Sequence, residues 1–474
     1  MFFLSTIRAG HTWGDDFAQY LHHAENIAQF VSYAETGYIY NPQNAIVGPQ
    51  SYPPAFPAAL APVAALFGAN LNAYKALNVF FFLVSLLIVT RLFANDLGRR
   101  NLWICLTIVG FSPVYWEMKD GIASEHLFMP LWYAALLFAD DWYRRQKVCV
   151  NQTLHGVILG GLVFLSCATR TVGIVLLPMI VVCEVVIARK ATRVGIIALL
   201  TAVALMVFER WLLPSSGAGY LEQLQGISLS SLAANAYADT TAFSLIWKNG
   251  HWDAVRRIAG AGFALLAIGG FLRTNLARPT PLGVALAGYF AVIVIWPSAD
   301  GLRMILPLLP AFVFYLLIGI NSFQTLPRGR LAASAGALLL LLFSLVSFGA
   351  AYAGADYGPI GSGVETRPAV ELFDFVRRQT TSDDVCLFFK PRALALYTGR
   401  RASAYPLGTD ERAFRQYAET IGASVMIVRM GAEALTNEDQ TSEMRAPLEA
   451  RDLGVVFENS EFRVYRWTRR EGIH

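Results

Sequence analysis

Long runs of apolar residues recur along the chain up to about residue 353. A helix that spans a bilayer needs about 20 mostly apolar residues. Helices satisfy their own backbone polar groups, which makes them the natural form of such runs in lipid. The pattern predicts a mainly α protein, a polytopic bundle of about ten transmembrane helices. The expected spans are 74–94, 102–118, 123–142, 153–169, 171–188, 194–213, 256–272, 281–297, 303–320 and 331–353.

Lysine and arginine are concentrated in alternate connections between these spans. Short loops rich in these residues remain in the cytoplasm. Residues 1–73, 214–255 and 354–474 are therefore expected on the opposite, extracytoplasmic face of the plasma (inner) membrane. The basic residues that set this orientation are Arg99, Arg100, Arg144, Arg145, Lys147, Arg189, Lys190, Arg193, Arg273, Arg278, Arg328 and Arg330.

The first residues pose a separate question. The apolar stretch 2–7 is too short to span, and it lacks the basic start and longer apolar run of a signal peptide. We interpret it as the end of a first transmembrane helix that is missing from the sequence. The alternative is a genuine amino terminus exposed on the outer side.

Two further segments precede the first expected span. Within residues 11–50, Phe17, Tyr20 and Leu21 recur at helical spacing among charged residues, which predicts an amphipathic helix lying on the membrane surface. The prolines of segment 52–57 suit the first turn of a second apolar helix that runs to about residue 67.

From residue 356 the composition becomes that of a soluble domain. The apolar pattern predicts a small α/β domain, and we divide the chain into a transmembrane domain over 1–353 and an extracytoplasmic domain over 354–474. Helices are expected at 367–379, 409–420 and 441–451, and strands at 385–389, 424–428, 454–457 and 462–467.

Composition supports a membrane protein and narrows the partners. Apolar residues make up 55% of the chain and charged residues 15%, against about 25% charged in an average soluble domain. The net charge of +4 is too small to indicate nucleic acid binding. The five cysteines are scattered without a Cys-x-x-Cys spacing, so no structural zinc site is expected.

Charged residues at a membrane boundary are costly unless they are paired, hydrated or functional. On the expected outer face, arginine could bind phosphate through its planar fork, and a carboxylate could act as general base. The candidates are Asp15, Asp16, Glu125, Arg170, Asp300 and Arg303.

Each candidate also has a simpler interpretation. Asp15 and Asp16 could cap a helix, and Asp300 could be a turn residue before Gly301. Glu125 could cap its helix or pair with Lys119. Arg170 could be an ordinary basic residue between helices, and Arg303 could contact lipid headgroups. His22 and His23 are weak candidates for metal ligands.

Several of these residues stand in motifs that occur in one order along the chain. Segments 13–20 and 24–27 resemble the first outer loop of the C-type (GT-C) glycosyltransferase superfamily, and segment 51–57 resembles its double-proline motif. Segments 124–128, 168–173 and 303–307 resemble three later motifs of the same superfamily. Its members include protein O-mannosyltransferases, bacterial aminoarabinose transferases and enzymes that decorate lipopolysaccharide.

The resemblance implies transfer of a sugar, with inversion, from a polyprenyl-phosphate donor to a lipid, glycan or protein acceptor. It implies that an aspartate of the first outer loop is the base. Asp16 is preferred over Asp15 because it lies four residues before Tyr20, on the same helix face. Tyr52 stands where several relatives carry lysine.

The hypothesis assigns Asp16 as base and places the donor phosphate on Arg170 and Arg303. Glu125 would orient a substrate or help to bind a divalent cation, and Tyr20 and Tyr52 would contact substrate. A transporter or flippase for a lipid-linked sugar is the rival, but it would need no base and often shows repeated halves. A third hypothesis is that the helices serve only as a noncatalytic membrane anchor for the carboxy-terminal domain.

Overall fold

The computed structural model describes residues 1–146, 151–213, 228–296, 302–325, 327–406, 410–430 and 453–467. The chain forms two compact units. We call Met1–Ile7, Lys75–Pro214 and Gly226–Tyr357 the helical unit, and Arg8–Tyr74 with Gly358–His474 the sheet unit. Predicted helix 441–451 and residue Asp300 lie outside the described residues.

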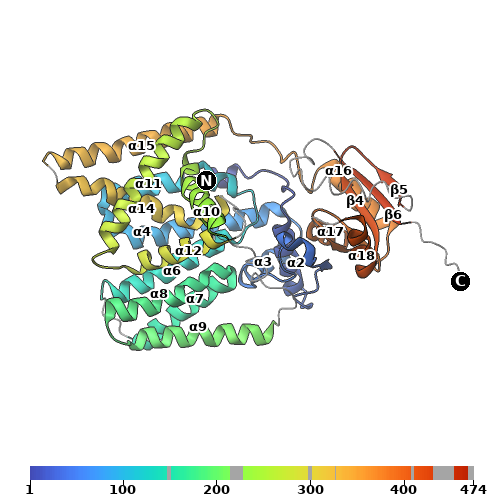
Figure 1. Cartoon of the computed structure of the whole chain (residues 1–474), viewed down its shortest axis with the longest axis horizontal. Coiled ribbons are helices and arrows are strands. Elements are labelled where there is room, and N and C mark those ends of the chain that lie inside the picture. The colour runs from blue at the N-terminus through green and yellow to red at the C-terminus, as the bar shows by residue number, and fades with distance from the viewer. Residues whose placement is uncertain are drawn as a thin grey trace. The chain divides into compact units, whose positions relative to one another are not determined.

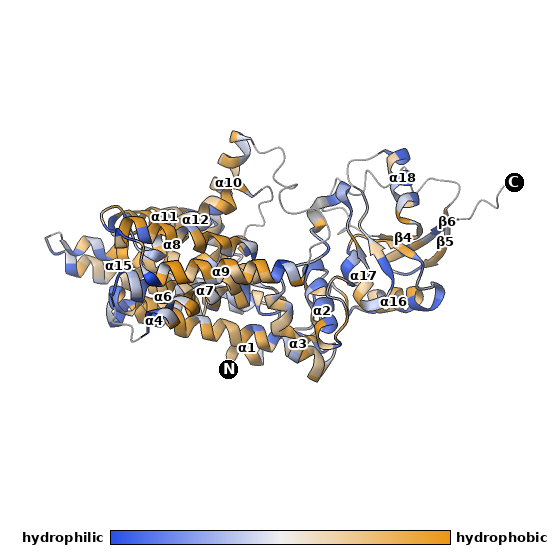
Figure 2. Cartoon of the chain, turned by 90° about the horizontal axis from the view of Figure 1, so that it is seen from below, coloured by the Kyte–Doolittle hydropathy of each residue, from blue (hydrophilic) through white to orange (hydrophobic). Residues whose placement is uncertain are grey.

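The helical unit is a bundle of long apolar helices (Figure 1). Figure 2 shows that hydrophobic residues predominate along these helices. Its elements are α1 (Phe2–Ser5), α4 (Leu71–Gly110, which begins in the sheet unit), α5 (Pro113–Met118), α6 (Glu125–Tyr143), α7 (Gln152–Thr169), η2 (Thr171–Val175), α8 (Leu176–Val182), η3 (Cys183–Ala188), α9 (Arg193–Leu212), α10 (Leu229–Ala242), η5 (Phe243–Trp247), α11 (Asp253–Asn275), α12 (Pro281–Ile295), α13 (Leu302–Ile305), η6 (Leu306–Leu308), α14 (Leu309–Asn321), η7 (Ser322–Thr325) and α15 (Gly329–Ala353).

The predicted spans coincide with these helices, although 102–118 is divided between α4 and α5. Within the described residues, seven helices are long and apolar enough to cross a membrane. Helix α6 is not among them because Glu125, Asp140 and Asp141 lower its hydropathy, and α12 is shorter than the rest. The chain is therefore a multi-pass membrane protein with the mainly α fold that the sequence predicted.

Helix α4 contains the first basic connection. Gly98 has φ +67° and ψ 166°, which breaks the helix between the first two predicted spans. Glycine adopts positive φ without the steric cost that a Cβ atom imposes. Arg99 and Arg100 directly follow this break, so they lie where the short turn between the two predicted spans is expected.

Helices α7 and α9 lie side by side at close range (Figure 1). A Cβ atom on Gly160 would stand 2.4 Å from the carbonyl oxygen of Ala198, and one on Gly156 would stand 2.9 Å from that of Val194. The two glycines are four residues apart, as in the small-residue motif that lets membrane helices approach closely.

The sheet unit contains six strands in the order β1-β3-β2-β4-β6-β5. The first four are parallel neighbours, and β6 pairs antiparallel with both β4 and β5. Its elements are α2 (Asp15–Ala28), β1 (Tyr38–Ile39), η1 (Pro42–Val47), α3 (Ala55–Phe67), α16 (Arg367–Gln379), β2 (Val385–Leu387), α17 (Pro391–Thr398), β3 (Arg401–Ser403), α18 (Glu411–Ile421), β4 (Ala423–Arg429), β5 (Leu453–Glu458) and β6 (Phe462–Trp467).

The amino-terminal segment completes this sheet. Tyr38 of β1 pairs with Ala402 of β3, and Ile39 pairs with Ser403. The structure thus groups residues 8–74 with the carboxy-terminal residues, whereas the sequence analysis placed them with the transmembrane helices. The expectation that the apolar face of α2 lies on the membrane surface is wrong, since α3 and α17 cover that face.

Candidate functional site

Glu125, Arg170 and Arg303 come together in the helical unit. Oε1 of Glu125 lies 2.8 Å from Nη1 of Arg170 and 2.9 Å from Nε of Arg303. Arg170 also donates to the hydroxyl of Ser124 at 3.2 Å. The structure therefore joins three of the predicted substrate-binding residues in one ion-pair cluster.

Arg170 is positioned by a tight turn between α7 and η2. Its backbone is extended, with φ −146° and ψ 132°, and its carbonyl accepts a bond of 2.8 Å from the amide of Gly173. A Cβ atom on Gly173 would stand 2.6 Å from the carbonyl carbon of Ser166. Only glycine fits there, so the Arg-x-x-Gly spacing has a steric reason.

The segment that carries Arg303 is held through its backbone carbonyls. Pro310 has no amide hydrogen and cannot bond the carbonyl of Leu306, four residues earlier. The hydroxyl of Tyr115 fills this role at 2.8 Å. Two more tyrosine hydroxyls bond the same segment. Tyr289 donates to the carbonyl of Met304 at 3.1 Å, and Tyr133 donates to the carbonyl of Pro307 at 2.7 Å. Three tyrosines from different helices thus fix the start of this segment.

Within the described residues, the carboxylate of Glu125 contacts both guanidinium groups of the cluster. The side chain of Glu125 is fully buried, whereas that of Arg303 is 37% exposed. Oε2 of Glu125 is buried and has no hydrogen-bond partner among the described residues. A buried polar atom is stable only when it is hydrogen-bonded, so the open Oε2 suits a ligand with a hydroxyl group, and the guanidinium groups beside it suit an anionic one.

The alternative pairing of Glu125 with Lys119 does not occur. The ammonium of Lys119 lies 2.7 Å from Oδ2 of Asp120 and 4.1 Å from the centre of the Trp116 ring. Glu125 is instead neutralised by residues far away in sequence.

An apolar cavity lies in the same unit. It measures about 560 Å³ and is bounded by α10, α11, α12 and the segment from η6 to α14. Leu308 and Phe312, which follow Arg303 in the chain by five and nine residues, are part of its wall. The wall is almost entirely hydrocarbon and aromatic, as expected of a site for an apolar ligand.

Asp16 and Tyr52 come together in the sheet unit. The Tyr52 hydroxyl donates to Oδ1 of Asp16 at 2.6 Å. The ring of Tyr20 packs 5.0 Å from the ring of Tyr52. The Asp16 side chain is 33% exposed and can therefore be reached by a ligand.

Asp15 has a different environment from its neighbour. It is buried, and its Oδ1 accepts a bond of 3.2 Å from the backbone amide of Ala393, in the first turn of α17. Carboxylates are favoured at helix N-termini. Burial nevertheless raises the pKa of the Asp15 carboxyl from 3.8 to about 6, despite the opposing charges of Arg392 and Lys390. Asp15 therefore caps the α17 helix, although the capping role was anticipated for α2.

The aromatic ring of Trp13 fixes the start of α2. Its ring lies among four phenylalanines of the carboxy-terminal residues, with ring centres 5.4 to 6.0 Å away: Phe373, Phe388, Phe389 and Phe462. The two aspartates follow at once in the chain, so this contact sets their place in the unit.

Arg392 was not among the residues predicted from the sequence. Its side chain is fully buried, and Nη1 donates to the Tyr52 hydroxyl at 2.5 Å and to Oδ1 of Asp16 at 3.3 Å. Nη2 donates to the carbonyl of Pro49 at 2.7 Å. Nothing in the local sequence distinguishes this arginine from an exposed one, because its partners lie more than 300 residues earlier.

His23 is a structural residue in this unit. Its Nδ1 donates to the carbonyl of Tyr33 at 2.6 Å, which leaves Nε2 to accept the amide of Tyr52 at 3.4 Å. Burial lowers the pKa of the His23 imidazole to about 3. Both ring nitrogens are therefore engaged, and the described residues contain no group of three or more His, Cys, Asp or Glu that could hold a metal ion.

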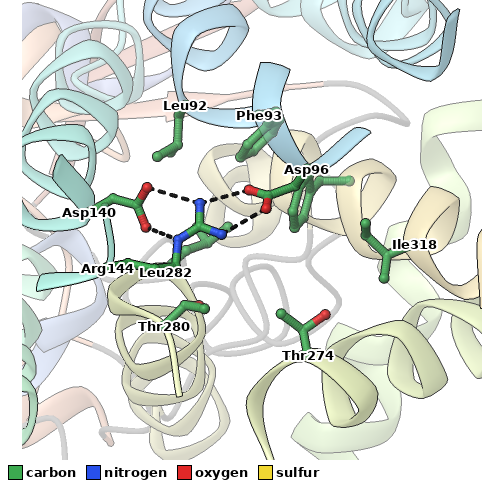
Figure 3. A pocket seen from close by; sticks show the side chains of 10 residues that line it. Leu92, Phe93, Asp96, Asp140, Arg144, Thr274, Thr280, Leu282 and Ile318 are labelled. Atoms are coloured by element: carbon green, nitrogen blue, oxygen red, sulfur yellow. Dashed lines mark hydrogen bonds and ion pairs between the residues drawn. The ribbon is translucent and has the colours of Figure 1, made fainter. Parts of the chain in front are cut away.

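A second polar cluster belongs to the helical unit and surrounds Arg144 (Figure 3). This arginine makes bidentate contacts with Asp96 of α4 and Asp140 of α6, at 2.6 to 2.9 Å. The adjacent cavity measures only about 120 Å³. With each carboxylate bound by both its oxygens, the cluster ties two helices together and leaves little capacity for a ligand.

The fold is similar to those of solved membrane glycosyltransferases. The aminoarabinose transferase ArnT from Cupriavidus metallidurans, solved with undecaprenyl phosphate, has a TM-score of 0.57 at 12% identity over 98% of this chain and 95% of its own. The oligosaccharyltransferase AglB from Archaeoglobus fulgidus, solved with an inhibitory peptide and a dolichol-phosphate, has a TM-score of 0.56 at 12% identity over 89% of this chain and 66% of its own.

Both neighbours are GT-C glycosyltransferases, so the fold implied by the sequence motifs is confirmed. No protein-family model matches the sequence, and no curated protein is similar to it.

Proposed function

We propose that this protein is an inverting membrane glycosyltransferase that moves a sugar from a polyprenyl-phosphate donor to an acceptor hydroxyl at the extracytoplasmic face. The observation that carries the proposal is the cluster of two arginines on one buried glutamate within a GT-C fold. Undecaprenyl phosphate and dolichol-phosphate in the two neighbours support the donor class.

Arg170 and Arg303 are assigned to the donor phosphate. A guanidinium binds two phosphate oxygens through parallel hydrogen bonds, and Glu125 holds the two guanidinium groups beside one another. Oε2 of Glu125 would accept a hydroxyl of the donor sugar. Because Oε1 already contacts both arginines, we assign Glu125 to the arginines and the sugar rather than to a divalent cation.

The apolar cavity is assigned to the polyprenyl chain. Its wall includes Leu308 and Phe312, five and nine residues after Arg303, so a lipid chain could enter it while its phosphate is bound by that arginine. The polyprenyl chain is hydrocarbon and matches this apolar wall, whereas a soluble sugar phosphate has no group that would fill it.

Asp16 is assigned as the general base. It would remove the proton of the acceptor hydroxyl while the acceptor oxygen forms a bond to the anomeric carbon of the sugar. The bond from that carbon to the phosphate oxygen breaks with its electron pair, and polyprenyl phosphate leaves from the opposite face. The arginines stabilise the charge that develops on the leaving phosphate.

The test is sugar transfer by purified full-length protein in detergent, where no gradient exists across a membrane. Synthetic polyprenyl-phosphate sugars would be screened as donors, with a membrane extract as acceptor source, and release of polyprenyl phosphate would be measured. We expect release with one donor and its loss in Asp16→Asn, by about a hundredfold or more.

Transfer that persists in Asp16→Asn would overturn the assignment of the base. Binding of the donor without any release, under conditions where vesicles translocate it, would instead favour the transporter or flippase.

A further inference from the structure

We infer that Arg392 is a positioning residue for the Asp16 carboxylate and acts mainly through the Tyr52 hydroxyl. The inference rests on the proposed function, because it presumes that Asp16 is the base. It assigns a role in the reaction to the carboxy-terminal part of the chain.

The hydrogen bonds fix the direction in which the Tyr52 hydroxyl points. Nη1 of Arg392 donates to the hydroxyl oxygen at 2.5 Å. Guanidinium cannot accept a hydrogen bond, so the tyrosine hydrogen is directed at Oδ1 of Asp16, 2.6 Å away. Oδ1 of Asp16 also accepts a hydrogen bond directly from Nη1 of Arg392 at 3.3 Å. One carboxylate oxygen is thus held by two donors that depend on the same arginine.

Arg392 is itself held rigidly. Its guanidinium carbon lies 4.7 Å from the ring centre of Tyr38 and 4.6 Å from that of Tyr52, so the cation is stacked between two aromatic faces. Such stacking is strong where water is excluded. The bond to the carbonyl of Pro49 sets the rotation of the guanidinium plane.

Burial makes direct binding of substrate an unsuitable role for Arg392. Its side chain is fully covered, whereas that of Asp16 is one-third exposed. Asp16 is therefore accessible to substrate, whereas Arg392 can act only by holding Asp16 and Tyr52 in place. A nearby positive charge favours the ionised form of a carboxyl group, which is the form that a general base requires.

Several other charged or titratable groups surround this carboxylate and enter any account of its ionisation. Asp15 precedes it in the chain, and Tyr52 contacts it directly. Asp15 opposes ionisation of Asp16, whereas the cations favour it. Other titratable groups packed around the arginine and Tyr52 include Tyr20, Tyr33, Tyr38, Lys390 and His23.

The test is a set of variants measured by the release of polyprenyl phosphate as a function of pH. In Arg392→Gln we expect kcat to fall at least about tenfold, with the acidic limb of the profile moved up by about one pH unit. The limb moves up because a base without its neighbouring cation ionises at higher pH. KM for the donor should change less than about twofold. Arg392→Lys should recover part of kcat and return the limb toward its original position.

Arg400→Lys is the matched control. Arg400 lies in the same unit and bonds Thr380 and the carbonyl of Arg377, but it contacts no carboxylate in the described residues. It should behave like the unchanged protein. If Arg392→Gln does not fold, Tyr52→Phe replaces it, because this variant keeps the ring on which the arginine stacks and removes only the hydroxyl.

An acidic limb that stays in place in folded Arg392→Gln, or in Tyr52→Phe in its stead, overturns the inference. So does a rise in KM with kcat unchanged. Asp16→Asn separates this result from a failure of the proposed function. If the unchanged protein releases no polyprenyl phosphate from any donor, the proposed function is wrong. If Asp16→Asn keeps its activity, Asp16 is not the base; if it loses activity while the Arg392 variants match Arg400→Lys, only the role of Arg392 is wrong.

Discussion

Nε of Arg303 lies 2.9 Å from Oε1 of Glu125, although 178 residues separate the two in the chain. The same oxygen contacts Arg170 at 2.8 Å. One carboxylate oxygen thus orients two guanidinium groups. Glu125 is fully buried and Arg303 is partly exposed. The buried carboxylate therefore holds in place a guanidinium group that a ligand can reach.

Glu125→Gln should weaken both stability and transfer. The amide keeps the shape but removes the negative charge that contacts both guanidinium groups. Removing one partner of a buried pair costs roughly 3–5 kcal/mol, and we expect the lower end or less because Arg303 is 37% exposed. Melting temperature in detergent would fall, and kcat/KM for the donor would fall about a hundredfold through misplaced arginines. A variant with unchanged kcat/KM would contradict this role.

Arg303→Lys should raise KM for the donor about tenfold with a smaller effect on stability. Lysine keeps the charge but loses the planar fork that binds a phosphate through two bonds. The control is Arg256→Lys, since Arg256 bonds Asp253 and Ser244 in the same helical unit and lies outside the proposed site. Equal KM values for the two variants would argue against phosphate binding by Arg303.

Asp15 should make the stability of the protein depend on pH. Its pKa is raised from 3.8 in the unfolded chain to about 6 in the folded protein. The folded state therefore binds more protons between these values, so stability is greatest below about pH 4 and falls as pH rises to about 6. The free energy of unfolding should fall by about 3 kcal/mol between these two pH values because of this group.

Asp15→Asn should remove most of this slope and keep the cap on α17 through its amide oxygen. Melting curves of the two proteins between pH 4 and pH 8 would check it. The variant should keep most of its transfer activity, unlike Asp16→Asn. Equal loss in both variants would mean that Asp15 also takes part in the chemistry.

Gly160→Ala should destabilise the helical unit, whereas Gly161→Ala should not. The added methyl group at position 160 meets the backbone oxygen of Ala198 at 2.4 Å, but nothing lies within 4 Å of the corresponding point at position 161. We expect a loss of about 1–3 kcal/mol from overpacking in the first case. Alanine should be neutral or slightly stabilising in the second. Melting temperatures of the two adjacent variants give the comparison, and equal values would argue against close packing of α7 on α9.

The sequence was sufficient to group Glu125, Arg170 and Arg303, because each stands at an end of an apolar segment that alternation assigns to one side. It was not sufficient to choose the partner of Glu125. Proximity along the chain suggested Lys119, but the adjacent Asp120 binds that lysine. The choice depends on how α6, α7 and α13 pack, which periodicity does not encode.

The sheet unit was only partly predictable. Helix 367–379 and strand 462–467 have the predicted bounds, because their apolar patterns are regular. Strands β1 and β3 contain two and three residues, which is too short for any alternation to be recognised. Without that pairing, nothing joined Asp16 to Arg392.

The pairing of β1 with β3 has a consequence for synthesis. Ser403 follows its partner Ile39 by 364 residues, and ribosomes add roughly 5–20 residues per second. The early segment must therefore wait roughly 20–75 s for the residues that complete its sheet. A chain cut short before β3 would leave Tyr38 and Ile39 as a strand without this neighbour, and an unpaired strand edge is a template for aggregation.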